Sequence, residues 1–279
     1  MDLTKDWDCW EERLLRVTVK LGGSILEEAA TRRAVIRQVA ALVGQGHEII
    51  LVHGGGKSLS RCLSQLGIES RFIDGLRVTD AATLRVAVMV LAGEVNKMLV
   101  AEIAEQGCRA LGICGADASA VRCDRLSDLS GAPQALEFVG KPVSVDLEFF
   151  ELVLRSGLVP VVSSIALGPD FHLYNVNADQ MASTCAWGTG CRALVYLTDV
   201  PGVRGENGTV LKSIGRKGIE DLRARGILSG GMLPKTTSSL EALENGIESV
   251  YIVPGTSLEA LNGVVHGNVT EGTHIHGND

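Results

Sequence analysis

Aromatic residues and long apolar runs are both scarce in this sequence. Phe, Trp and Tyr make up 4% of its 279 residues, which argues against base-stacking platforms and carbohydrate-type clefts. The sequence has no run of about eighteen apolar residues, so we expect no membrane-spanning helix. Residues 1–16 begin with acidic side chains and lack the apolar core of a signal peptide, so we expect no secretory signal.

The sequence also has fewer basic than acidic residues. The 26 Lys and Arg residues are outnumbered by 33 Asp and Glu residues, which gives a formal net charge of −7. Proteins that bind the nucleic-acid backbone are normally basic, so the composition disfavours a nucleic-acid partner. An acidic chain can still bind a small anion, because that needs only a local positive potential.

The spacing of the cysteines argues against two further classes of protein. The seven cysteines are scattered and never form a C-x-x-C pair, which disfavours a disulfide framework and a zinc ribbon. Reduced and largely buried thiols in a cytoplasmic protein are the favoured interpretation.

What the sequence does contain is an alternation of strand-like and helix-like segments. Apolar runs of strand length occur at Arg16–Leu21, Glu48–His53, Arg109–Cys114, Leu158–Ser163, Ala193–Thr198 and Ser249–Val253. Segments of helix length lie between them, including Ile25–Val43 and a long stretch from Asp80 to about Gln106. Strands joined by helical crossovers predict an α/β fold with a mainly parallel sheet and helices on both faces. Two hairpins are expected as well, at residues 71–79 and 119–145.

Three glycine-rich segments stand directly before predicted helices. They are residues 20–24 (KLGGS), 53–58 (HGGGKS) and 230–235 (GGMLPK). Glycine leaves backbone N–H groups accessible and a helix N-terminus favours an anion, so each segment is a candidate phosphate site. Neither the Walker A spacing nor a G-x-G-x-x-G fingerprint is present, which excludes a P-loop and disfavours a dinucleotide site. In the second segment, His53 and Lys57 are interpreted as structural or solvent-facing.

Charged and amide side chains beside these segments extend the candidate site. Lys235 would lie in the first turn of its helix, where the helix dipole disfavours a cation, so we expect the negative charge of a ligand to compensate it. Arg77, in a tight turn, suits a carboxylate that binds both arms of the guanidinium. Asn175, Asn177 and Asp179 alternate, so we expect them to point one way unless Asn177 only caps the following helix.

Five ordered motifs carry a family resemblance. KLGGS, VHGGG, GLRVT, NVNADQ and GGMxxK occur in the order and approximate spacing of the amino acid kinase superfamily, and the sequence resembles its N-acetylglutamate kinases from about residue 17 to residue 253. The resemblance implies an open, mainly parallel eight-stranded sheet sandwiched between helices. It also implies an N-terminal lobe, residues 1–177, that binds the acyl amino acid and dimerises, and a C-terminal lobe, residues 178–279, that binds ATP.

The resemblance also implies roles for individual positions. The implied catalytic residues are Lys20, Lys235 and Asp179, with the aspartate orienting the two phosphate-bridging lysines. Substrate binding is implied for Gly54, Gly55, Arg77 and Asn175, and Gly54 and Gly55 are implied, like Gly22 and Gly23, to face the phosphates. ATP binding is implied for Gly22, Gly23, Thr198, Asp199 and Gly231. No side-chain metal site is expected, because Mg²⁺ would be carried by the nucleotide and keep most of its water.

The implied reaction is ATP-dependent phosphorylation of the side-chain carboxylate of N-acetyl-L-glutamate, the second step of arginine and ornithine biosynthesis, by a cytoplasmic homodimer. That carboxylate is already ionised at neutral pH, so the sequence need not supply a general base. Two alternatives stay open: a kinase for an aminoadipate derivative one methylene longer, and a non-catalytic arginine or nitrogen sensor on the same scaffold. Inhibition by arginine and a hexameric assembly are also left open.

Two terminal segments have no role in this interpretation. Leu3, Trp7, Trp10 and Leu14 have near-helical spacing, which predicts a short flanking helix before the first strand. His274 and His276 alternate near the C-terminus, where a metal site is conceivable but an incidental pair is the favoured interpretation.

Overall fold

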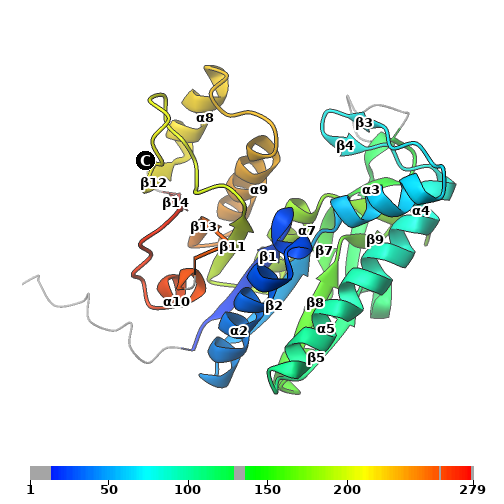
Figure 1. Ribbon diagram of the computed structural model, residues 1–279, viewed down its shortest axis with the longest axis horizontal. Coiled ribbons are helices and arrows are strands. Elements are labelled where there is room, and N and C mark those ends of the chain that lie inside the picture. The colour runs from blue at the N-terminus through cyan, green and yellow to red at the C-terminus, as the bar shows by residue number, and fades with distance from the viewer. Residues whose placement is uncertain (1–13, 129–135, 258, 278–279) are drawn as a thin grey trace, which may run out of the picture.

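The computed structural model describes residues 14–128, 136–257 and 259–277 and has one eight-stranded sheet at its centre (Figure 1). The strand order is β12–β14–β13–β11–β1–β2–β8–β5. In that order the strands are Ser213–Gly215, Thr273–His276, Ser249–Pro254, Ala193–Thr198, Arg16–Leu21, Glu48–His53, Val159–Ser163 and Ala110–Ile113. The strands from β13 to β5 are all parallel, and β14 runs antiparallel to β13. The predicted open, mainly parallel α/β sheet is confirmed.

Helices cover both faces of this sheet, because alternate strand residues feed two separate hydrophobic clusters. In β2, Ile49 and Leu51 belong to one cluster, whereas Ile50 and Val52 belong to the other. The first cluster includes residues of α1 (Ser24–Glu27), α2 (Ala29–Gly44), α3 (Gly56–Gln65), α4 (Ala81–Ala87), α5 (Asn96–Glu105) and α10 (Ala260–Val265). The second includes residues of α6 (Leu147–Arg155), α7 (Ala178–Gly188), α8 (Arg216–Ala224) and α9 (Met232–Glu244). The result is the predicted three-layer sandwich.

Both predicted hairpins are present. Strands β3 (Phe72–Ile73) and β4 (Leu76–Arg77) pair across a turn in which Asp74 and Gly75 both have positive φ, 49° and 80°. Strands β6 (Val121–Arg125) and β7 (Val139–Val145) also pair antiparallel, and with β9 (Ile165–Leu167) and β10 (Leu173–Val176) they form a small closed barrel. In Figure 1 the β3–β4 hairpin lies at the same end of the molecule as α3 and α4.

Two predicted helices are interrupted. The segment predicted as one helix from Ile25 to Val43 breaks at Glu28, whose extended backbone ends α1 and whose carboxylate caps α2 by accepting from the Ala30 and Thr31 N–H groups. The helix predicted from Asp80 to about Gln106 begins as expected with Asp80 as N-cap, but its middle, η1 (Val88–Val95), is π-helical. Side-chain spacing alone does not distinguish a π-turn from an α-turn, so the sequence pattern could not reveal it.

The two terminal segments have different outcomes in the structure. Leu3, Trp7 and Trp10 lie outside the described residues, so the predicted flanking helix is not tested. His274 and His276 belong to β14, where the His274 ring stacks on Tyr251 with 4.7 Å between ring centroids. That strand, together with β12 and α10, was not predicted. Within the described ranges, no helix has both the length and the apolar character needed to cross a bilayer.

Candidate functional site

The site lies where four neighbouring parallel strands end. Strands β11, β1, β2 and β8 are adjacent in the sheet, and open α/β sheets bind ligands at the carboxyl ends of such strands. The segments KLGGS and HGGGKS follow β1 and β2, so two of the three predicted glycine-rich segments lie side by side.

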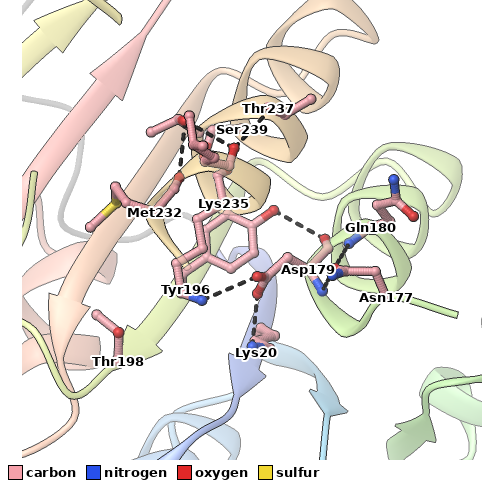
Figure 2. Close-up of polar contacts among 12 residues, drawn as sticks. Lys20, Asn177, Asp179, Gln180, Tyr196, Thr198, Met232, Lys235, Thr237 and Ser239 are labelled. Carbon is pink, nitrogen blue, oxygen red and sulfur yellow. Dashed lines mark hydrogen bonds and ion pairs between the residues drawn. The ribbon is translucent and has the colours of Figure 1, made fainter. Parts of the chain in front are cut away.

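Lys20, Asp179 and Lys235 meet above the end of β1 (Figure 2). Lys20 comes from β1, Asp179 from the first turn of α7 and Lys235 from the first turn of α9. The Lys20 Nζ atom lies 2.7 Å from Asp179 Oδ1, and the Lys235 Nζ atom lies 3.1 Å from Asp179 Oδ2. One carboxylate therefore holds two ammonium groups, one on each oxygen.

Burial makes this trio electrostatically unusual. Lys20 is 6% exposed and Asp179 is 5% exposed. Burial lowers the pKa of Lys20, although the Asp179 carboxylate opposes that shift. Burial acts to raise the pKa of Asp179, but the charges of Lys20 and Lys235 outweigh it and hold that pKa below its usual value. With both amines protonated the trio carries one net positive charge, which is a local attraction for an anion.

The trio corrects one expectation about Lys235. Its position in the first turn of α9 was expected to be compensated by the charge of a ligand, but in the structure the compensating charge is the Asp179 carboxylate. Asp179 is itself well placed, because an anion in the first turn of α7 is favoured by that helix dipole. The Tyr196 hydroxyl adds a hydrogen bond of 3.2 Å to the Asp179 main-chain carbonyl.

The alternating residues Asn175, Asn177 and Asp179 do not all point one way, since Asn175 and Asn177 line one cavity and Asp179 does not. Asn177 caps α7, accepting from the N–H groups of Asp179 and Gln180. The Asn175 Nδ2 group donates to Thr79 Oγ1 over 3.1 Å. Of the three, only Asp179 forms ion pairs with the lysines, from the first turn of α7.

A cavity of about 170 Å³ at the N-terminus of α7 is lined by all four residues predicted to bind the acyl amino acid. Those residues are Gly54, Gly55, Arg77 and Asn175. Ala178 also lines this cavity and is the chain neighbour of Asp179, so the cavity abuts the N-terminus of α7. A molecule in the cavity therefore lies at the N-terminus of the helix whose first turn carries Asp179.

Arg77 is the cation of this cavity and has only neutral partners. Its Nη1 group donates to Ser70 Oγ over 2.6 Å, and its Nη2 group donates to Ser60 Oγ over 2.7 Å and to the Gly56 carbonyl over 3.2 Å. The side chain is 8% exposed, and burial lowers its pKa. Among the residues that the structure describes, no carboxylate forms an ion pair with Arg77. A buried guanidinium without a counter-ion is suited to an anionic ligand.

The residues predicted to bind ATP lie around the ends of β1 and β11 and at the start of α9. Gly22 lies so close to the Lys20 ammonium that a Cβ atom there would collide with Nζ, and Gly23 has a φ of 58°. Thr198 ends β11, and the next residue, Asp199, accepts a hydrogen bond of 3.1 Å from Ser24 Oγ. Gly231 immediately precedes α9. Their role in nucleotide binding stays a prediction.

Two polar residues of the site were not identified from the sequence. Thr79 is fully buried and links Asn175 to the Arg77 carbonyl, to which its hydroxyl donates over 2.9 Å. Tyr196 is buried within an apolar strand, where a single aromatic residue carries no local signal of a polar contact. Lys57 is exposed, as predicted. In the described ranges, no group of three or more His, Cys, Asp or Glu side chains is arranged to hold a metal ion.

Sequence comparison agrees with the motifs. The profile described as "Amino acid kinase family" matches residues 16–254. A protein of Acidobacterium capsulatum named acetylglutamate kinase is 45% identical over 261 residues, which are 94% of this chain and 99% of that protein. Its counterpart in Koribacter versatilis is 44% identical and covers 94% of this chain and 98% of that protein.

Structural comparison gives the same fold at lower identity. The N-acetylglutamate synthase of Neisseria gonorrhoeae, solved with coenzyme A and N-acetylglutamate, superposes with a TM-score of 0.82 at 21% identity, over 95% of this chain and 60% of that one. The carbamate kinase of Giardia lamblia, solved with AMP-PNP, superposes with a TM-score of 0.67 at 15% identity, over 95% of this chain and 99% of that one.

Proposed function

The chain belongs to the amino acid kinase family, and from that premise we propose that it transfers the γ-phosphoryl group of ATP to the side-chain carboxylate of N-acetyl-L-glutamate. The products are N-acetylglutamyl 5-phosphate and ADP, and the reaction is the second step of arginine and ornithine biosynthesis. The observation that carries the proposal is the Lys20–Asp179–Lys235 trio, together with a cavity at the N-terminus of α7 whose Arg77 has no ion-pair partner among the described residues.

The charges suit this chemistry. A carboxylate oxygen of the acceptor attacks the γ-phosphorus, a C–O–P linkage forms, and the bond to the bridging oxygen breaks with its electron pair leaving on ADP. No proton is removed, because the acceptor is ionised at neutral pH. The difficulty is the repulsion between two anions, which Lys20 and Lys235 would relieve by binding the oxygens on which charge develops. Asp179 holds both amines in place and needs no role as a base.

The proposal extends to the form of the nucleotide, the lobe that binds each substrate, the assembly of the protein and its location. ATP would enter as its Mg²⁺ complex, with the metal held mainly by phosphates and water. We assign ATP to the C-terminal lobe, residues 178–279, and the acyl amino acid to residues 1–177. We also propose a homodimer formed through the α4–η1–α5 helix, on which Met89 is 53% exposed, and a cytoplasmic location in keeping with the free cysteines of the described residues.

The acceptor is tested by trapping the acyl phosphate with hydroxylamine. We expect hydroxamate to form from ATP and N-acetylglutamate at a kcat/KM roughly 10- to 200-fold above that for N-acetylaminoadipate, since one methylene is worth about 1–3 kcal/mol in a fitted pocket. Plain glutamate, which lacks the acyl group, should react more slowly still. A preference for the longer acceptor would favour the aminoadipate alternative. Absence of turnover with every acceptor would favour the sensor.

The role of Arg77 is tested by measuring the KM for N-acetylglutamate in variants of this residue. Replacing Arg77 by alanine should raise the KM for N-acetylglutamate by about 10- to 100-fold, because a hydrogen-bonded charge pair contributes about 1.5–3 kcal/mol. The KM for ATP should change little. Arg77→Lys keeps the charge but not the planar fork, so its KM should fall between those of the wild type and the alanine variant. An unchanged KM in the alanine variant would mean that Arg77 only supports the β3–β4 hairpin.

A further inference from the structure

His53 is a buried polar side chain that the proposed chemistry does not use. It ends β2 and is completely buried. Because strand residues alternate, His53 points away from the face on which Val52 and Lys20 lie and toward α5. There its Nε2 atom lies 3.1 Å from Asn96 Nδ2, and its Nδ1 atom lies 2.8 Å from the carbonyl oxygen of Gly54.

The contacts of Asn96 fix which ring nitrogen carries the proton. Asn96 Nδ2 lies 2.8 Å from the Val161 carbonyl, which can only accept, and Lys97 Nζ donates to Asn96 Oδ1 over 3.1 Å. The Asn96 amide therefore donates to His53 Nε2, which leaves the proton of the neutral ring on Nδ1. Burial lowers the pKa of His53 to about 4, so the ring is neutral at neutral pH. Nδ1–H accordingly donates to the Gly54 carbonyl.

This hydrogen bond sets the direction of the next peptide group. Gly54 is held at both ends, since its N–H donates to the Leu21 carbonyl over 3.0 Å and its carbonyl accepts from His53. In a planar trans peptide the C=O and N–H groups point in opposite directions, and the described residues contain no cis peptide. The Gly55 N–H therefore points away from the His53 ring. It has no acceptor among the described residues, and Gly55 lines the cavity.

The π-helical segment η1 holds the same loop from the other side. A Cβ atom on Gly55 would lie 2.7 Å from Leu91 Cδ2, and Gly55 has a φ of 148°. Leu91 and Val95 belong to η1, and Asn96 is the first residue after it. The π-helical segment thus supplies the apolar wall against Gly55, and the residue directly after it supplies the amide that orients His53. Such π-segments are frequent at functional sites.

We propose that His53 and Asn96 are positioning residues that hold the Gly54–Gly55 peptide so that the Gly55 N–H donates to the phosphoryl group in transfer. This inference rests on the proposed function and adds two residues to it. Neither side chain touches a substrate. Their effect is exerted on one backbone donor, so it should appear in kcat rather than in the KM of either substrate.

Two substitutions of His53 separate this role from simple packing. In His53→Asn the amide nitrogen occupies the position of Nδ1 and can still donate to Gly54, although the contact with Asn96 is lost. In His53→Gln the amide occupies the position of Nε2, which keeps the Asn96 contact but leaves Gly54 without its donor. Glutamine fills more of the space that histidine occupied, so packing alone predicts that His53→Gln is the milder change.

We expect the opposite order for kcat. His53→Gln should lose about 100-fold in kcat, the typical effect of one misdirected backbone donor, with both KM values within a few-fold of wild type. His53→Asn should keep kcat within about 10-fold of wild type, even where its melting temperature is the lower of the two. A kcat for His53→Gln equal to or above that of His53→Asn would overturn the proposal.

Nitrogen-15 NMR of the histidine ring gives a readout that does not depend on turnover. We expect wild-type His53 to be a neutral Nδ1–H tautomer that does not titrate between pH 5 and pH 8, in line with its pKa of about 4. An active enzyme whose His53 is the Nε2–H tautomer would overturn the role of His53 alone. A wild-type chain that forms no acyl phosphate would instead overturn the proposed function, and the positioning role with it.

Discussion

Replacing Lys20 or Lys235 by methionine is expected to lower kcat by about 100-fold or more. Each amine would bind an oxygen on which charge develops during transfer, and the loss of one such preorganised donor typically costs about 100- to 1,000-fold. The fold should survive, because Asp179 keeps the other lysine as a partner. Hydroxamate formation under saturating ATP and N-acetylglutamate measures kcat, and thermal unfolding measures stability.

Lys57 provides the matched control. It also follows a strand end in a glycine-rich segment, but its side chain is exposed and lies outside the trio. Lys57→Met should therefore leave kcat within about two-fold of wild type, as is usual for a solvated surface charge. Near-wild-type turnover in both Lys20→Met and Lys235→Met would remove the lysines from the mechanism.

Replacing Asp179 by asparagine should reduce both stability and turnover. The change leaves the buried Lys20 amine and the partly buried Lys235 amine close together without their anion, and breaking a buried ion pair costs about 3–5 kcal/mol. Turnover should fall as far as in the lysine variants, because neither amine is then held in place. Chemical denaturation gives the free energy of unfolding, and the hydroxamate assay gives kcat.

A double variant identifies the source of that instability. Lys20→Met together with Asp179→Asn removes one of the two unpaired amines, so this chain should be more stable than the one with Asp179→Asn alone. Its turnover should not recover, because a bridging amine is missing. Suppose instead that adding Lys20→Met to the Asp179→Asn chain lowers its free energy of unfolding by as much as Lys20→Met lowers that of the wild type. The two residues then do not interact in the folded protein.

Much of the fold could be predicted because the central strands have a simple signal. Runs such as Glu48–His53 are apolar on both faces, as buried parallel strands require, and they end abruptly at glycine. The short strands β12 and β14 give no comparable signal. The π-helical stretch η1 is specified by long-range packing of Leu91 and Val95 against Gly55, which no local pattern records.

The candidate site could be predicted only in part, from those of its residues that belong to recognisable motifs. Lys20 and Arg77 belong to motifs that stand out in the sequence, KLGGS and GLRVT. In the structure Lys20 pairs with Asp179, and Arg77 lines the cavity together with Gly54, Gly55 and Asn175. That Asp179 would bind both lysines came from the family resemblance, since nothing in the local sequence joins three residues so far apart. His53 was interpreted as structural because one histidine at a strand end gives no indication of its contact with Asn96.

The most direct measurement is a crystal structure with a non-hydrolysable ATP analogue, Mg²⁺ and N-acetylglutamate bound together. We expect both the Lys20 and the Lys235 Nζ atoms at hydrogen-bond distance from oxygens of the terminal phosphate, with Asp179 still between them and the acceptor carboxylate facing the phosphorus. A complex in which either amine points away from that phosphate, while the acceptor carboxylate is aligned for attack, would contradict the account.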